Sequence, residues 1–219
     1  MKEIKKYDRI NLFNHYQTFD NPFLILTTKI DITNIVNYCK KEGSFYATMG
    51  YLITKTVNNI DAFKYRYQNG KIYYYDNLDS NYTNMYADGN IGFYNVDFND
   101  NYKVYINSYK KIYSDFYSKK IKRGDRREDV IWLSCFPWNE FSGLIPPFNK
   151  NITIPQFIWD KYHLENNNYY INLMILVHHG FADGSHISKF LIDLKNNIEY
   201  FSRWLYVYKK WKRSNLSNY

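Results

Sequence analysis

The hydrophobic positions of the chain follow a helical spacing in four stretches, which predicts four helices. These stretches are residues 32–44, 44–60, 101–121 and 185–205. In each, the apolar side chains gather on one face of the predicted helix. Gly43 is a candidate C-terminal cap for the first helix, and Ser44 is a candidate N-cap for the second. We expect the second helix, which is apolar over much of its surface, to be largely buried.

Other stretches have the short apolar or alternating patterns that are typical of strands. Aromatic side chains alternate over residues 63–76 around Asn69–Gly70, a pair that suits a two-residue hairpin turn with positive φ. Further strands are predicted at 81–87, 91–98, 129–138, 152–160 and 169–179. The last of these is apolar on both faces for most of its length, so we expect it at the centre of a sheet.

The order of these elements predicts the α+β class. We expect a two-layer sandwich in which helices flank a large mixed β-sheet. No internal repeat and no linker interrupts the pattern, so residues 1–219 are predicted to form a single domain. Hydrophobic residues make up 45% of the chain, which supplies enough apolar surface for a sizeable core.

The chain is basic, with a formal net charge of +8, and this raises the question of an anionic partner. Its basic residues are scattered, and the densest run, at 118–129, also contains Asp125, Glu128 and Asp129. We interpret that run as a solvated helix end and loop. The aromatic residues lie at core spacing and not beside basic residues, which argues against nucleic-acid binding. The charge does favour an anionic cofactor.

The cysteines and the apolar runs bear on the compartment. Cys39 and Cys135 are far apart and form neither a CxxC motif nor a disulfide framework. The first residues contain no long apolar stretch of the kind found in signal peptides. No run approaches the roughly 20 apolar residues of a membrane span. The sequence therefore predicts a reduced, soluble, cytoplasmic protein that does not bind a membrane.

The strongest chemical signal lies where the strand at 169–179 meets the helix at 185–205. The segment HHGFADG, residues 178–184, spans that junction. Because neighbouring strand residues point to opposite faces, the two histidines cannot easily share a metal ion. Zinc needs three or four converging ligands, and no Cys or carboxylate has a spacing that matches His186, so we expect no metal. Two interpretations stay open: a pair of structural histidines, or one histidine that acts as a general base.

This segment matches the HHxxxDG signature of the chloramphenicol acetyltransferase family. Related HxxxDG motifs occur in the acyltransferase cores of 2-oxo-acid dehydrogenase complexes and in the condensation domains of peptide synthetases. The resemblance to the first family covers nearly the whole chain: the opening at 7–20, the segments at 30–35 and 45–76, the stretch VIWLSCFPWNEFSG at 130–143, and the approach to the motif at 159–179. It implies the fold of the CoA-dependent acyltransferases.

The resemblance also implies a reaction. In that family the second histidine of the motif is the general base, so this role falls on His179 while His178 is expected to be structural. The base takes the proton from an acceptor hydroxyl as the oxygen attacks the thioester of acetyl-CoA, the co-substrate. A serine hydroxyl of the S-x-x-P-W segment stabilises the oxyanion, and Ser134 occupies that place.

Asp183 is a structural residue in the family, where an ion pair with an arginine near the N-terminus fixes the turn and the histidine. By position, His15 stands where the family has that arginine. The partner of Asp183 is therefore expected to be a protonated His15, the nearby Arg9 or another cation. Gly184 is expected to allow a close approach of the backbone or a positive φ after the turn.

Two groups of residues correspond to the family's binding sites. Lys161 and Tyr162 match a CoA-binding Lys-Tyr pair, in which the ring can stack on adenine and the cation can neutralise phosphate. The acceptor pocket matches less well, because the stretch at 19–30 is shorter than in the chloramphenicol enzymes. The residues expected to form its wall are Phe93, Phe136, Phe141, Leu144, Pro146 and Ile158.

The family assembles as a homotrimer with its active sites between subunits, which implies that His179 of one chain faces Ser134 of a neighbour. Three functions are compatible with the sequence. The first is acetyl-CoA-dependent O-acetylation of chloramphenicol, which confers antibiotic resistance. The second is the same chemistry on another hydroxylated small molecule, and the third is a non-catalytic trimeric binding protein. Retention of His179 and Ser134 favours an acyltransferase, and we expect chloramphenicol as the acceptor.

Overall fold

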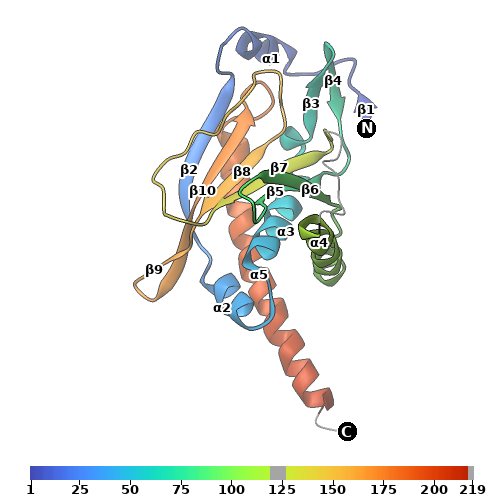
Figure 1. Ribbon diagram of the computed structural model, residues 1–219. Helices are drawn as coiled ribbons and strands as arrows, with labels where there is room; N and C mark the ends of the chain where they lie inside the picture. Colours follow the sequence, from blue (N-terminus) through green and yellow to red (C-terminus); the bar gives the residue numbers. More distant parts are fainter. Residues whose placement is uncertain (119–126, 217–219) are drawn as a thin grey trace.

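The larger β-sheet of the protein carries helices on one of its faces (Figure 1). The computed structural model describes the backbone of residues 1–118 and 127–216, and the side chains up to residue 201. The sheet has seven strands in the order β2-β10-β8-β7-β5-β6, with β9 paired to β10. They are β2 (Phe23–Asp31), β5 (Asp79–Met85), β6 (Ile91–Val96), β7 (Val130–Phe136), β8 (Gln156–Asp160), β9 (His163–Glu165) and β10 (Asn168–His178).

This sheet is mixed, as the sequence predicts. β7 runs parallel to both β5 and β8, whereas the other neighbouring pairs are antiparallel. β10 lies between β2 and β8, so the strand that is apolar on both faces is indeed central. The predicted α+β class, with a mixed sheet flanked by helices, is confirmed.

Four of the five described helices correspond to the predicted ones. The helices are α1 (Ile10–Gln17), α2 (Thr33–Glu42), α3 (Phe45–Asn58), α4 (Tyr102–Tyr117) and α5 (Gly184–Leu216). Ser44 caps α3 as expected, because its hydroxyl accepts a hydrogen bond of 3.3 Å from the N–H of Ala47. Gly43 follows α2 in an extended conformation with φ of −151°. The hydrophobic pattern missed α1 and ended α5 too early, since the helix continues to Leu216.

The strands separate two environments, because successive side chains point to opposite faces of the sheet. Tyr82, Ile131 and Phe157 point toward the helices and are fully buried in the main core. Asn81 and Ser134, on the same strands, point to the other face, which the helices do not cover. The core therefore lies on one side of β5, β7 and β8, and the opposite side is free to form a site.

A small second sheet, in the order β1-β4-β3, lies beside the first and consists of β1 (Lys2–Glu3), β3 (Tyr65–Gln68) and β4 (Lys71–Tyr74). Asn69 and Gly70, with φ of 50° and 79°, form the tight turn of its hairpin, as predicted. Arg66 ties this hairpin to β7. Its fully buried guanidinium donates hydrogen bonds of 2.8 Å to four backbone carbonyls, those of Phe63, Tyr65, Glu128 and Val130.

Two further expectations concern the basic run and the absence of a membrane-spanning segment. Most of the basic run at 118–129, interpreted as a helix end and loop, lies outside the described residues. Within residues 1–118 and 127–216, no helix combines the length and the apolar character needed to cross a membrane.

Candidate active site

The junction between β10 and α5 holds its first histidine inside the protein. His178 is 2% exposed, and its ring packs against Phe13, Phe23 and Phe181. Its Nδ1 accepts a hydrogen bond of 3.1 Å from the N–H of Gly180. Burial, with a smaller contribution from neighbouring His179, lowers the pKa of His178 to about 4. The ring is thus neutral at physiological pH and packs as part of the structure.

His179 lies in a different setting. Its backbone N–H donates a hydrogen bond of 2.8 Å to the carbonyl of Pro22, and its ring stacks on Tyr16 of α1 with centroids 4.2 Å apart and planes at 15°. Nδ1 is buried and has no hydrogen-bond partner among the described residues. Nε2 is therefore the accessible nitrogen, on a ring that the backbone and the tyrosine hold in place. Such a ring is suited to exchange a proton with a bound hydroxyl.

Asp183 is braced by Arg9 and not by His15. The guanidinium of Arg9 donates a hydrogen bond of 2.9 Å to Oδ2 of Asp183, while Oδ1 accepts bonds from Ser185 and lies 2.8 Å from Nδ1 of His186. Partial burial alone would raise the pKa of Asp183, but the hydrogen bonds from Ser185 and His186 outweigh it and hold that pKa well below its ordinary value. Asp183 is therefore an ionised brace.

Of the partners that the sequence left open for Asp183, His15 is the one that the structure places elsewhere. The ring of His15 packs instead on Tyr16 and Phe19, with centroids 5.3 and 5.0 Å away. The reason is its place on α1: Arg9 comes just before this helix and reaches the turn, whereas His15 is in its last turn. His15 thus supports Tyr16, which in turn stacks on His179.

The glycine that the turn requires is Gly180. A Cβ there would lie 2.8 Å from Cα of Phe13, so the close approach of α1 to the turn leaves room only for glycine. Gly184, for which we expected such a requirement, is the first residue of α5. It has neither a positive φ nor any atom within 4 Å of an added Cβ. That expectation is corrected by the geometry.

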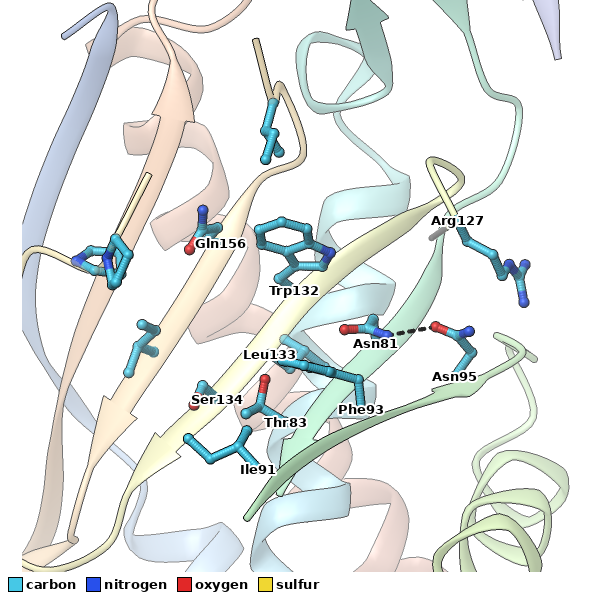
Figure 2. A pocket seen from close by; sticks show the side chains of 14 residues that line it. Asn81, Thr83, Ile91, Phe93, Asn95, Arg127, Trp132, Leu133, Ser134 and Gln156 are labelled. Carbon is cyan, nitrogen blue, oxygen red and sulfur yellow. Dashed lines mark hydrogen bonds between the residues drawn. The ribbon is translucent and has the colours of Figure 1, made fainter. Parts of the chain in front are cut away.

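Ser134 lies on the helix-free face of the sheet, at a cavity of about 580 Å³ (Figure 2). Of the predicted wall residues, Phe93, Pro146 and Ile158 line this cavity. Phe136, Phe141 and Leu144 do not line it. Phe136 and Phe141 pack instead near each other, with ring centroids 6.4 Å apart, and the N–H of Phe141 donates to Asp160.

The remaining lining residues were missed at the level of sequence. They are Asn81, Thr83, Ile91, Asn95, Arg127, Trp132, Leu133, Pro147, Ile152 and Gln156. A signal for several of them was present, because side chains two positions apart on a strand share a face. Trp132 precedes Ser134 by two residues on β7, and Gln156 precedes Ile158 by two residues on β8. The same rule applied to Ser134 would have found Trp132, and applied to Ile158 it would have found Gln156.

Ser134 and His179 are far apart within one copy of the chain. Ser134 pairs with Ile158 on β8, whereas the register of β8 and β10, extended beyond Gln156 and Leu176, places His179 near Thr153. At about 3.3 Å per residue and about 4.8 Å per strand, the two side chains are roughly 17 Å apart along the strands and roughly 10 Å apart across them. A small acceptor therefore cannot touch both side chains of one copy.

Lys161 and Tyr162 follow the end of β8 on the same edge of the sheet as the end of β7, where Phe136 pairs with Asp160. Both are exposed, and the ring of Tyr162 contacts Phe45 at 5.2 Å between centroids. Tyr169 makes a second edge contact with this ring, at 5.7 Å between centroids, and the residue stays 38% exposed. In the described part of the chain, no group of three His, Cys, Asp or Glu side chains is arranged to hold a metal ion.

The fold is that of the CoA-dependent acyltransferases. A solved chloramphenicol acetyltransferase superposes with a TM-score of 0.77 at 19% identity, covering 90% of this chain and 100% of its own. A probable dihydrolipoamide acetyltransferase from Listeria monocytogenes 4b F2365 superposes with a TM-score of 0.68 at 14% identity. The superposition covers 91% of this chain and 94% of the other. At these identities the likeness establishes the shared fold.

Sequence comparison narrows the class to one family. The family model described as chloramphenicol acetyltransferase matches residues 1–195. A chloramphenicol acetyltransferase of Clostridium perfringens is 30% identical over 93% of this chain and 96% of its own length. A chloramphenicol acetyltransferase of Staphylococcus aureus is 28% identical over 93% of this chain and 97% of its own length. The chain belongs to the chloramphenicol acetyltransferase family and is an acyltransferase.

Proposed function

We propose that the protein is an acetyl-CoA-dependent O-acetyltransferase that acetylates chloramphenicol and thereby confers resistance to it. The observation that carries this proposal is the setting of His179, whose ring is held at the end of β10 by Tyr16 and the backbone with Nε2 accessible. Family membership supplies the substrates, since the relatives over most of the chain are chloramphenicol acetyltransferases.

The proposed reaction needs a base, an oxyanion donor and a thioester. Nε2 of His179 takes the proton of the acceptor hydroxyl. At the same time the hydroxyl oxygen forms a bond to the thioester carbonyl carbon of acetyl-CoA. The hydroxyl of Ser134 donates a hydrogen bond to the resulting oxyanion. Collapse of this intermediate breaks the carbon–sulfur bond, and the imidazolium returns its proton to the leaving thiolate. The products are the acetyl ester and free CoA.

The separation of Ser134 and His179 supports a site shared between copies of the chain. Because about 17 Å along the strands and about 10 Å across them divide the two residues in one copy, both can act on one acceptor only if different copies supply them. A cyclic trimer presents each such pair three times in a ring of identical contacts. We therefore include a homotrimer in the proposal, with His179 of one copy facing Ser134 of the next.

The proposed CoA site uses Tyr162 for adenine stacking and Lys161 for phosphate. Support comes from their exposure at the edge where β7 and β8 end, and from the net charge of +8, which favours an anionic co-substrate. A cytoplasmic location belongs to the same proposal, because both cysteines are free thiols.

The direct test incubates the purified protein with acetyl-CoA and chloramphenicol and follows the release of free thiol. We expect turnover, a loss of about 10²–10⁴-fold in kcat for His179→Ala, and a loss of about 10²–10³-fold for Ser134→Ala. Absence of thiol release above background with the wild-type protein would contradict the proposed acceptor. Full turnover by His179→Ala would contradict the assigned base.

Co-expression of the two inactive variants tests the shared site. When Ser134→Ala and His179→Ala subunits mix at random in equal amounts, about one quarter of the interfaces combine an intact His179 with an intact Ser134. We expect co-expressed protein to recover activity on that scale, whereas each variant alone stays inactive. Recovery no greater than the sum of the single variants would show that one copy supplies both residues.

A second candidate is the same reaction on a different hydroxylated small molecule. The observation that favours it is the polar lining of the cavity, where Asn81, Asn95 and Gln156 stand beside the apolar Phe93 and Ile158. Thiol release with a panel of other small alcohols, measured beside the release with chloramphenicol, separates the two candidates.

A further inference from the structure

The connection between β7 and β8 is long and lies on the helix-free face of the sheet. Residues 137–155, all of them described, join the two strands without a helix or strand of their own, and we call them the strap. Such a long irregular connection is uncommon in a compact domain and is often functional. The strap passes over β10 and β2, where the ring of Phe148 contacts Phe23 with centroids 5.3 Å apart (Figure 1). Three of its residues line the cavity beside Ser134, namely Pro146, Pro147 and Ile152.

Asp160 fastens the strap near its beginning. This last residue of β8 is fully buried, and its Oδ2 accepts a hydrogen bond of 3.1 Å from the N–H of Phe141 in the strap. The side-chain amide of Asn172 on β10 donates to the same oxygen at 2.7 Å, and the backbone N–H of Asn172 donates to Oδ1 at 2.8 Å. One carboxylate therefore joins the end of β8, β10 and the strap.

The residue of the strap next to Phe141 meets the same stretch of chain a few positions further on. Oε2 of Glu140 lies 3.5 Å from Nδ1 of His163, the first residue of β9. Asp160 and His163 stand on either side of Lys161 and Tyr162 in the sequence. The contacts that hold the strap thus flank the two residues of the proposed CoA site.

Packing alone gives no reason for a carboxylate at position 160. Burial of an acidic side chain is costly unless it is well paired, and among the described residues no cation pairs with Asp160. An apolar side chain of similar size would avoid that cost. What the carboxylate adds is direction, because its two oxygens accept from three N–H groups that belong to different parts of the chain. It therefore selects one arrangement of these parts.

We infer that Asp160 is a positioning residue of the acetyl transfer, which holds the strap and the pair Lys161–Tyr162 in one fixed arrangement. It acts on the acceptor through the strap, which supplies part of the cavity wall, and on CoA through the two residues that follow it. Ser134 is held independently, because β7 pairs with both β5 and β8. This inference rests on the proposed function, since it takes Lys161 and Tyr162 as the CoA site.

Asp160→Asn tests the inference, because it keeps the size of the side chain and removes one acceptor oxygen. Its NH2 group would face N–H donors, so the amide cannot hold both the strap and β10. We expect the KM for chloramphenicol and the Kd for CoA, measured by titration calorimetry, each to rise about tenfold. We expect kcat to stay within about threefold of the wild-type value, since loss of binding alone raises KM and not the barrier. A merely structural role would lower the urea midpoint and leave KM and Kd unchanged.

Cleavage of the strap gives a readout that needs no turnover. Lys150 is exposed in the strap, and a protease that cuts after lysine acts where the backbone opens locally. We expect endoproteinase Lys-C to cut the native Asp160→Asn protein after Lys150 about tenfold faster than the wild-type protein, as followed by mass spectrometry.

The matched control is Asp193→Asn, which also removes one carboxylate but lies on α5, where Asp193 pairs with Lys189 at 2.7 Å. It should leave KM, Kd and the cleavage rate at their wild-type values. If Asp160→Asn does not fold, Asn172→Ala removes one of the three donors and should give the same changes at about threefold. Wild-type Kd and cleavage rate in these variants would overturn the inference. Weaker CoA binding and faster cleavage in Asp160→Asn, with no turnover of chloramphenicol by the wild-type protein, would support the inference and overturn the proposed acceptor.

Discussion

Replacement of Gly180 by alanine tests how closely α1 packs on the turn that carries His179. A Cβ at this position would lie 2.8 Å from Cα and 2.8 Å from Cδ2 of Phe13, and 3.1 Å from Cε1 of His178. Ordinary carbon–carbon contacts are about 3.5–4.0 Å long, so α1 has to move by roughly 1 Å. A change of rotamer cannot relieve the contact, because the atom in the way belongs to the backbone. Overpacking of this kind costs about 1–3 kcal/mol of unfolding free energy.

The same displacement acts on the proposed base. Tyr16 lies on α1 and stacks on His179, so a shift of the helix also changes the position of the imidazole. We expect Gly180→Ala to lower kcat as well as the urea midpoint, both measured at one fixed protein concentration because the protein is proposed to be oligomeric.

Gly184→Ala is the matched control within the same motif. Its added methyl group meets no atom within 4 Å, and the residue begins a helix, so the variant should be as stable as the wild-type protein or up to about 1 kcal/mol more stable. Wild-type stability for Gly180→Ala, or a larger loss for Gly184→Ala, would refute the packing argument.

Two further predictions concern buried groups. Burial lowers the pKa of His178 to about 4, so below pH 6.5 the unfolded chain binds a proton that the folded protein excludes, and stability falls as the pH drops toward 4. Between pH 7 and pH 5 this contributes a loss of about 2 kcal/mol, which urea unfolding should show for the wild-type protein and not for His178→Phe. Arg66→Met leaves four carbonyls without their donor, two in buried and two in part-buried hydrogen bonds, and we expect it to cost about 3 kcal/mol in the same assay at pH 7. A loss below about 1 kcal/mol would mean that water replaces the guanidinium.

The secondary structure was predictable because burial imposes a period on each element. The helices α2, α3 and α4 and the strands β7 and β10 bury one face or both, and their apolar positions repeat accordingly. α1 was not predicted because Phe13 is its only buried residue. A single buried position does not produce a repeating hydrophobic pattern. The hairpin at Asn69–Gly70 was found for another reason, since its positive φ angles limit the choice of residues.

The site was only partly predictable. The resemblance to the family pointed to His179 through the HHxxxDG motif and to Ser134 through the S-x-x-P-W segment, and their catalytic roles are part of the proposal. The partner of Asp183 was left open among several cations, and the structure selects Arg9, 174 positions away. Which cation meets a carboxylate over such a distance depends on how α1 is oriented, and local pattern carries no information about that. For the same reason Phe136, Phe141 and Leu144 were expected in the cavity wall, and the described wall contains none of them.

The two faces of β5, β7 and β8 explain how an acyltransferase of this fold can change its acceptor without losing its stability. Tyr82, Ile131 and Phe157 fill the core from one face, whereas Asn81, Ser134 and Gln156 meet the cavity from the other. A substitution on the cavity face leaves the core contacts unchanged, because neighbouring side chains of a strand point in opposite directions.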